Sequence, residues 1–201
     1  MWIEDEAALK ALYGEPGEAS IIKEVTSLTP EYRALIEASP FCVLATAGEG
    51  GLDATPRGDP AGFVDVLDDR TLLMPDRRGN NRIDSLLNVV RDPRVGLLFF
   101  VPGVNETLRV NGRARITADA GLLERYAMDG KTPRTALVVT VEAVYFQCSR
   151  ALHRSKLWDA SLHRIRTELP SPGQMLKGAQ ASFDAVTYDT ALDARQKSTL
   201  Y

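Results

Sequence analysis

The chain has 201 residues, and its 24 Lys and Arg against 27 Asp and Glu give a formal net charge of -3. A hydrophobic content of 44% is enough to bury the core of one globular domain, and a charged content of 25% is ordinary for such a domain, which excludes wholesale disorder. Two Cys and two His are too few for a four-cysteine zinc site, a three-histidine metal centre or a disulfide framework, so we expect no metal.

A helical extension is predicted for residues 1–39. Residues 4–13 begin with an acidic turn and carry apolar residues on one face, which is typical of a helix. Thr29 as the N-cap and Pro30 at the first helical position predict a second helix that continues to Ile36.

From residue 41 onward, the pattern changes to apolar, often alternating runs joined by short turns. These runs predict strands at 41–47, 52–56, 63–69, 71–75, 95–103, 107–117 and 135–148. Helical spacing appears at 80–93 and again at 119–130. The short turns favour antiparallel pairing, and the lack of alternation between strands and helices argues against a Rossmann fold.

We therefore predict a mainly β fold with flanking helices, in which about six antiparallel strands form a small barrel or closed sheet over residues 40–160. A helical tail is predicted to follow over residues 161–201 and to pack on the barrel, with short helices at 171–181 and 190–197.

The charges are unevenly distributed along the chain. Residues 1–24 hold six acids and two lysines, whereas the nearly neutral remainder clusters its bases at 77–82 and 150–156. A nucleic-acid surface would need a broad basic excess, so the clusters indicate a bound small anion rather than a nucleic acid. The acidic start lacks the basic leader of a secretory signal, and no apolar run reaches the ~18 residues of a membrane span. We expect a cytoplasmic protein without a membrane partner.

The segment PDRRGNNR (75–82) lies between a predicted strand and the start of a predicted helix. A helix start exposes unpaired N–H groups and the positive end of the helix dipole, and Asn80 or Asn81 can cap it. Arg82 is electrostatically unfavourable there unless an anion lies between it and the dipole. The segment therefore predicts a phosphate site, although a solvated loop would also explain it.

Three further segments carry polar side chains that could meet a ligand. Arg57 follows Pro56 at the end of a predicted strand, where Asp59 could orient it, and the strand at 107–117 presents a polar face. Residues 148–159 bring donors close to Trp158, whose ring could stack on a planar ligand. A surface ion pair, a solvated sheet face and a Trp that covers the core are the structural alternatives.

Taken in order, the signatures PRGD (56–59), PDRxGNxR (75–82), NExLRVNGxA (105–114) and CxxAxxRSxLWD (148–159) resemble those of the pyridoxamine 5'-phosphate oxidase-related superfamily, in an uncharacterised branch of it. The resemblance covers roughly residues 30–160. It implies a split β-barrel that forms a homodimer and binds FMN in a cleft between the subunits.

The resemblance also implies roles for individual residues around the FMN phosphate. Arg57, Asn81 and Arg82 would hold the phosphate. The segment from Asp76 to Asn80, with Arg77 in it, would wrap the phosphate and the ribityl chain.

A second group of residues would reach the flavin ring. Thr107, which stands where the oxidases proper have Gln, would face the isoalloxazine. Arg154, Ser155 and Trp158 would reach the same ring, from either the same subunit or its partner.

One feature of the oxidases proper is different here. They use an Arg-x-His sequence near the C-terminus to grip the substrate, whereas this chain has Arg150-Ala-Leu-His153 and a dissimilar ending. The difference argues against pyridoxamine phosphate oxidation.

The resemblance implies an FMN-dependent oxidoreductase that acts on an unidentified small molecule, with NADH or NADPH as a candidate reductant. The flavin would carry the redox chemistry, and no side chain stands out as a general acid or base. Two alternatives remain: a flavin-binding or flavin-sensing module without turnover, and a related barrel that uses a deazaflavin or haem.

Overall fold

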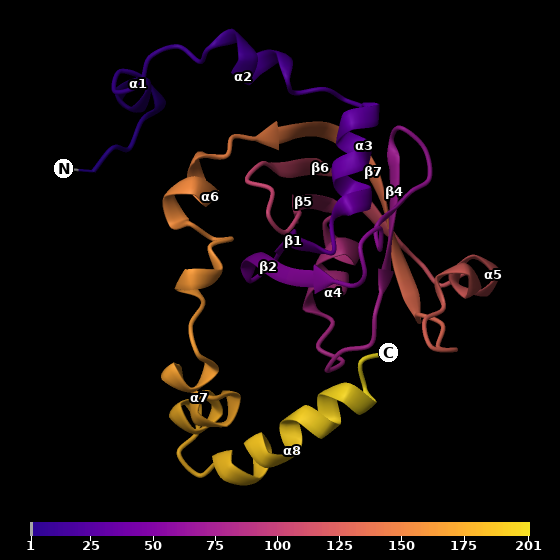
Figure 1. Ribbon diagram of the computed structural model, residues 1–201. Coiled ribbons are helices and arrows are strands. Elements are labelled where there is room, and N and C mark those ends of the chain that lie inside the picture. Colours follow the sequence, from indigo (N-terminus) through magenta and orange to yellow (C-terminus); the bar gives the residue numbers. More distant parts are fainter. Residues whose placement is uncertain (1) are drawn as a thin grey trace.

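The computed structural model describes residues 2–201 and contains a sheet of seven strands (Figure 1). The strands are β1 (Phe41–Gly48), β2 (Gly51–Gly58), β3 (Asp65–Val66), β4 (Thr71–Asp76), β5 (Arg94–Phe100), β6 (Thr107–Thr117) and β7 (Thr135–Gln147). Their order is β2-β1-β5-β6-β7-β4-β3, and neighbouring strands are antiparallel. The predicted mainly β, antiparallel architecture is confirmed.

The sheet differs from the expectation in strand number and closure. It has seven strands, one for each of the seven predicted runs, where a barrel of about six was expected, and it has two edges, β2 and β3, so it is not closed. The predicted strand at 63–69 is reduced to Asp65–Val66 because a turn follows, in which the Leu67 amide donates to the Thr71 carbonyl at 2.9 Å. A two-residue strand offers few ladder hydrogen bonds with which another strand could close the sheet.

The helices flank this sheet. They are α1 (Glu6–Lys10), α2 (Glu18–Ile22), α3 (Pro30–Ala38), α4 (Asp84–Arg91), α5 (Ala120–Leu123), α6 (Arg150–Ser155), α7 (Pro172–Ala179) and α8 (Ala185–Ser198). The N-cap prediction for α3 is confirmed, since Thr29 Oγ1 accepts a hydrogen bond from the Tyr32 amide at 3.3 Å. The helix expected from residue 80 begins only at Asp84, so residues 80–83 form a loop instead.

The main hydrophobic core lies between the curled sheet and the helices α3 and α4. Alternate residues of β1 and β5, such as Leu44, Leu97 and Phe99, point into it and are fully buried. From α3, the Ile36 side chain is completely buried in the same core. β4 contributes Leu72 and Met74 to this core, and β2, which buries no residue, is held in place by its pairing with β1.

The longest strand pair, β6 and β7, curves at a bulge. The register shifts between Asn111 and Gly112, and a side chain at Gly112 would collide with the Thr140 carbonyl. Only glycine fits this close approach. The 13 residues of β7 can span up to roughly 40 Å, so its two ends, Thr135 and Gln147, lie far apart.

Two segments extend away from the sheet: the N-terminal arm (residues 2–24) and the C-terminal tail (residues 160–201) (Figure 1). Neither α1, α2 nor α8 buries a residue, and Trp2 is 90% exposed. In the tail, α7 and α8 pack against each other through Asp189, whose carboxylate accepts from Ser171 Oγ and the Gly173 amide. Across residues 2–201, none of the helices combines the length and apolar character needed to cross a bilayer.

Candidate functional site

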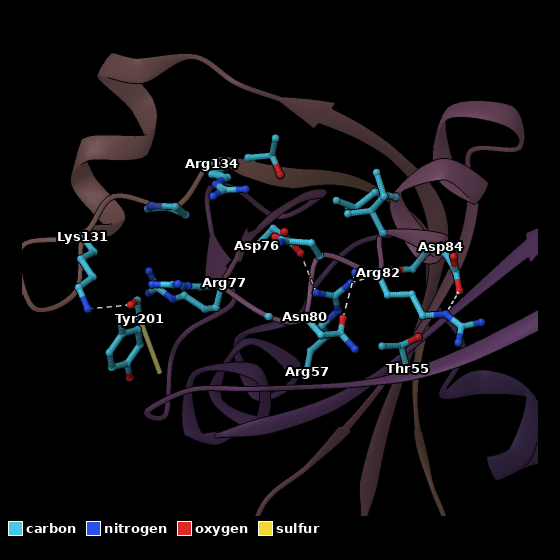
Figure 2. Close-up of a pocket in the computed structure, with 18 of the residues that line it drawn as sticks. Thr55, Arg57, Asp76, Arg77, Asn80, Arg82, Asp84, Lys131, Arg134 and Tyr201 are labelled. Carbon is cyan, nitrogen blue, oxygen red and sulfur yellow. Dashed lines mark hydrogen bonds and ion pairs between the residues drawn. The ribbon is translucent and has the colours of Figure 1, made fainter. Parts of the chain in front are cut away.

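A cavity of about 830 Å³ opens beside the ends of β2 and β4 (Figure 2). It is bordered by β2, the β4–α4 loop, the first turn of α4 and the loop before β7. Its lining residues are Asp53, Thr55, Arg57, Asp76, Arg77, Arg78, Gly79, Asn80, Asn81, Arg82, Ile83, Asp84, Ser85, Leu86, Lys131, Thr132, Pro133, Arg134, Thr135 and Tyr201. Six residues that the sequence assigns to the phosphate end of a cofactor are thus gathered at one place.

Arg57 is held rigidly on one wall of this cavity. Its Nη1 lies 2.7 Å from Asp76 Oδ1, and its Nη2 donates to Ser85 Oγ at 2.7 Å. The third donor, Nε, is buried and has no hydrogen-bond partner. The predicted partner of Arg57 was Asp59, but the carboxylate that orients it belongs to Asp76 at the end of β4.

The start of α4 forms an adjacent wall. Its N-cap residue, Ile83, makes no side-chain capping bond, so the first amide groups of the helix lack the usual acceptor. Ser85, in the first turn, accepts from Arg57 and is buried. A guanidinium and a helix N-terminus therefore face the same space, which is the arrangement that binds phosphate and other anions.

The β4–α4 loop owes its shape to two asparagines. Asn80 Oδ1 accepts from the Arg82 amide at 2.9 Å, and Asn81 adopts the left-handed conformation with φ of 61°, which Asn tolerates better than most residues. The conformation turns the chain into α4. Both side chains border the cavity, as the phosphate prediction requires.

Arg82 lies just before α4 rather than within its first turn. Its Nε is 2.5 Å from Asp84 Oδ2, and the hydrogen bond and charge of Asp84 raise the pKa of the guanidinium. The Asp84 carboxylate offsets a positive charge that would otherwise oppose the helix dipole. The Arg82 side chain is 77% exposed, so it has freedom to turn toward a ligand.

Arg77 also lines the cavity, but its donors are largely engaged by the protein. Its Nε is 2.5 Å from Asp59 Oδ2, and its Nη1 donates to the Tyr126 carbonyl at 2.5 Å. The Asp59 side chain is only 3% exposed, so this ion pair is well shielded from water. Arg77 therefore fastens the β4–α4 loop to the neighbouring elements.

The structure adds residues that no sequence pattern pointed to. Ser85, Lys131, Arg134, Thr135 and Tyr201 all border the cavity (Figure 2). They come from the first turn of a helix, a loop, a strand start and the end of the tail, and no motif links them. Only the fold brings them together.

The second predicted group lies elsewhere in the protomer. Thr107 is buried at the start of β6, opposite Gln147, the residue at the far end of β7 from the cavity. Trp158 Nε1 donates to the Val104 carbonyl at 2.8 Å, and Ser155 Oγ donates to the Leu152 carbonyl at 3.2 Å. These residues and the exposed Arg154 do not line the cavity of their own chain.

The cavity is suited to a ligand with several acceptor oxygens. Among the buried side-chain polar atoms of residues 2–201, Arg57 Nε and Thr135 Oγ1 are the two without a partner, and both residues line it. Unpaired buried polar atoms are costly, so their presence at one cavity is consistent with a polar ligand that pairs with them. The phosphate and hydroxyl groups of FMN would meet this need.

Cys42, which lies opposite Arg57 in the β1–β2 pairing, does not add thiol chemistry to the site. Its side chain is buried, and burial raises the pKa of the thiol to about 12 even though the nearby Arg57 charge acts the other way. A thiol with so high a pKa is protonated and unreactive at neutral pH.

Residues 28–148 match the family model described as Pyridoxamine 5'-phosphate oxidase. The match spans more than half of the chain and covers the strands and the cavity residues up to Thr135. The chain belongs to the pyridoxamine 5'-phosphate oxidase family. A comparison with curated protein sequences returned no match.

Solved structures with a similar fold include HupZ of Group A Streptococcus, at 19% identity and a TM-score of 0.48, over 59% of this chain and 93% of that one. A Clostridium acetobutylicum protein related to general stress protein 26 has 19% identity and a TM-score of 0.46, over 58% and 85% of the two chains. At these values, the likeness carries no information about activity.

Proposed function

We propose that the protein is an FMN-binding flavoprotein that works as an FMN-dependent oxidoreductase on a small molecule. The observation that carries the proposal is Arg57, which is fixed between Asp76 and Ser85 at the start of α4 with one buried donor left unpaired. A phosphate beside the Arg57 guanidinium and the α4 N-terminus would gain charge-assisted hydrogen bonds.

The remaining phosphate-end residues fit the same cofactor. Asn81 and Arg82 would complete the phosphate shell, and Asp76 and Asn80 would lie along the ribityl chain. Arg77 would act mainly by holding the β4–α4 loop, because Asp59 and Tyr126 already engage it. When bound, FMN would supply the electron-transfer chemistry, and the protein would supply binding and orientation.

The ring end of the cofactor leads us to propose a homodimer. Thr107, Arg154, Ser155 and Trp158 lie toward the opposite end of β7 from the cavity, so they would reach the flavin of a partner subunit rather than their own. The N-terminal arm and the C-terminal tail support this association, since both expose large apolar side chains. Their charges are also complementary: residues 1–24 are acidic, while residues 150–166 are rich in Arg and Lys.

Within this proposal, the open sheet is the split barrel of residues 40–160, with residues 1–39 as an extension and residues 161–201 as a helical tail that meets the barrel at Tyr201. A cytoplasmic location, in keeping with the two cysteines of the chain, and reduction of the flavin by NADH or NADPH also belong to the proposal.

Titration with FMN and with riboflavin tests the proposal directly, because riboflavin lacks the phosphate. We expect FMN to bind the purified protein and to bind more tightly than riboflavin, as measured by quenching of flavin fluorescence. Equal affinity for the two flavins would contradict the phosphate assignment, and no binding of either would overturn the cofactor itself.

Two further measurements separate the parts of the proposal. Bleaching of the bound flavin by NADH or NADPH, followed by turnover with an electron acceptor, distinguishes an oxidoreductase from a binding module. Light scattering of the FMN-loaded protein reports the oligomeric state. A monomer at full FMN occupancy would refute the shared site.

A further inference from the structure

The C-terminal tail leaves the sheet at one end and returns to it at the cavity. The chain passes through α6, α7 and α8, and its last described residues approach the β4–α4 loop, which is where Figure 1 marks the C-terminus. Tyr201 lines the cavity, and Figure 2 shows it between Lys131 and Arg77. The family match stops at residue 148, so Tyr201 lies outside the matched residues.

Three separate parts of the structure hold Tyr201. Its hydroxyl donates to Asp59 Oδ1 at 2.6 Å, and Lys131 Nζ donates to its main-chain oxygen at 2.8 Å. The guanidinium of Arg77 lies 5.7 Å from the centre of its ring, within the range of a cation–π interaction. Asp59 joins these contacts, because its other oxygen accepts from Arg77 Nε.

The rest of the tail is attached far more weakly. Within the described residues, 2–201, no hydrogen bond or ion pair connects residues 160–200 to residues 2–155. The helix α8 buries no residue, although it is 14 residues long. The attachment of the tail near the cavity therefore depends on Tyr201.

We propose that Tyr201 is a latch residue of the cofactor cavity. Its ring and main chain close one side of the cavity, and its contacts with Asp59, Arg77 and Lys131 hold together the three loops from which these residues come. The ligand leaves when Tyr201 releases these partners and the weakly attached tail swings away. The identity of this ligand as FMN rests on the proposed function.

The latch acts on the same residues that shape the phosphate end. Arg77 follows Asp76 directly, and Asp76 is the partner of Arg57, so loss of the Tyr201–Asp59 bond loosens the chain next to the phosphate site. Tyr201 is thus a positioning residue as well as a wall. Its release should speed cofactor dissociation more than it changes cofactor association.

The test compares three variants. Tyr201→Phe removes the hydroxyl bond to Asp59 but keeps the ring over Arg77, whereas Tyr201→Ala removes both. Tyr188→Phe is the matched control, because Tyr188 lies on α8 against Phe183 and away from the cavity. All three are made in the full chain.

The first readout is the FMN dissociation rate from the loaded protein, followed by recovery of flavin fluorescence. We expect Tyr188→Phe to match the wild type and Tyr201→Phe to be faster by a few fold. For Tyr201→Ala, we expect an increase of about tenfold or more, because this variant loses the ring over Arg77 as well as the hydrogen bond to Asp59. An unchanged rate in Tyr201→Ala would overturn the latch.

The second readout is amide hydrogen exchange in cofactor-free protein. Tyr201→Ala should raise exchange in residues 76–82 and 131–135, with no comparable change in Tyr188→Phe. Unchanged exchange in these segments would also refute the latch. If the wild type fails to bind FMN, the proposed function is wrong, and the exchange measurement alone then decides whether Tyr201 holds the cavity closed.

Discussion

The two ends of β7 have different degrees of organisation. At the Thr135 end, polar side chains from four parts of the chain hold one another in place around a cavity. At the Gln147 end, Ser155 and Trp158 donate hydrogen bonds to main-chain carbonyls of their own chain, and Thr107 is paired with Gln147. None of these residues lines the cavity. Under the proposed function, one protomer would build the anion-binding half of a site and would present the other half elsewhere on its surface.

Removal of Arg57 should have the largest effect at the cavity end. Arg57→Ala deletes a charge-assisted contact to the phosphate and leaves Asp76 without its partner, so FMN affinity should fall by about 1.5–3 kcal/mol, roughly tenfold to hundredfold. Fluorescence titration measures the loss, and riboflavin affinity should change much less. The control is Arg113→Ala on the outer sheet face, where Arg113 pairs with Glu142. Equal losses for the two flavins would show that Arg57 does not contact the phosphate.

Removal of Arg154 tests the other end of β7. If the Gln147 end of one protomer completes the site of its partner, Arg154→Ala should weaken FMN binding severalfold and shift the flavin absorption band without dissociating the dimer. Absorption spectra and light scattering measure these changes. An unaltered spectrum and affinity would show that the Gln147 end lies outside the site and would contradict the shared site.

A smaller effect on FMN affinity is expected for Arg82, although it is part of the PDRxGNxR signature (75–82). The side chain is 77% exposed and already paired with Asp84, so Arg82→Ala should cost FMN binding about 1 kcal/mol or less, and the loss should shrink at high salt. Titrations at low and high salt concentration measure this dependence. A loss as large as that of Arg57→Ala would show that Arg82 turns inward when FMN binds.

The smallest effect concerns stability at alkaline pH near the cavity. The Tyr126 hydroxyl donates to Asp65 Oδ2 at 2.7 Å, and burial, with that hydrogen bond and the Asp65 charge, raises the pKa of Tyr126 to about 12. The fold thus favours the neutral phenol. This stabilisation is complete below the ordinary tyrosine pKa of about 10 and is lost as the pH rises toward 12.

Tyr126→Phe isolates this contribution. Urea unfolding between pH 9 and 11 should show a steeper loss of stability in the wild type than in the variant. The reason is that residue 126 of the wild type ionises at a lower pH in the unfolded chain than in the folded one, whereas Phe does not ionise. Parallel curves for the two proteins would contradict the assignment.

Local patterns were sufficient for much of the fold. Thr29 and Pro30 predicted the start of α3, and the runs at 41–47, 71–75 and 107–117 agree closely with β1, β4 and β6. Capping and side-chain alternation depend on residues that are close in the sequence, so both can be recognised from the sequence alone. The short β3 and the late start of α4 were missed because a turn and a left-handed Asn81 end the local pattern early.

The sequence by itself determined the class of fold, the family resemblance and the segments that carry the anion-binding residues. Which side chains meet became clear only from the tertiary structure. There, Arg57 bonds to Asp76 and Ser85, and Arg77 bonds to Asp59. Tyr201, at the end of the tail, lies at the cavity. The physical reason is that these contacts join residues up to 142 positions apart, and such pairings follow from strand order and register rather than from any local periodicity.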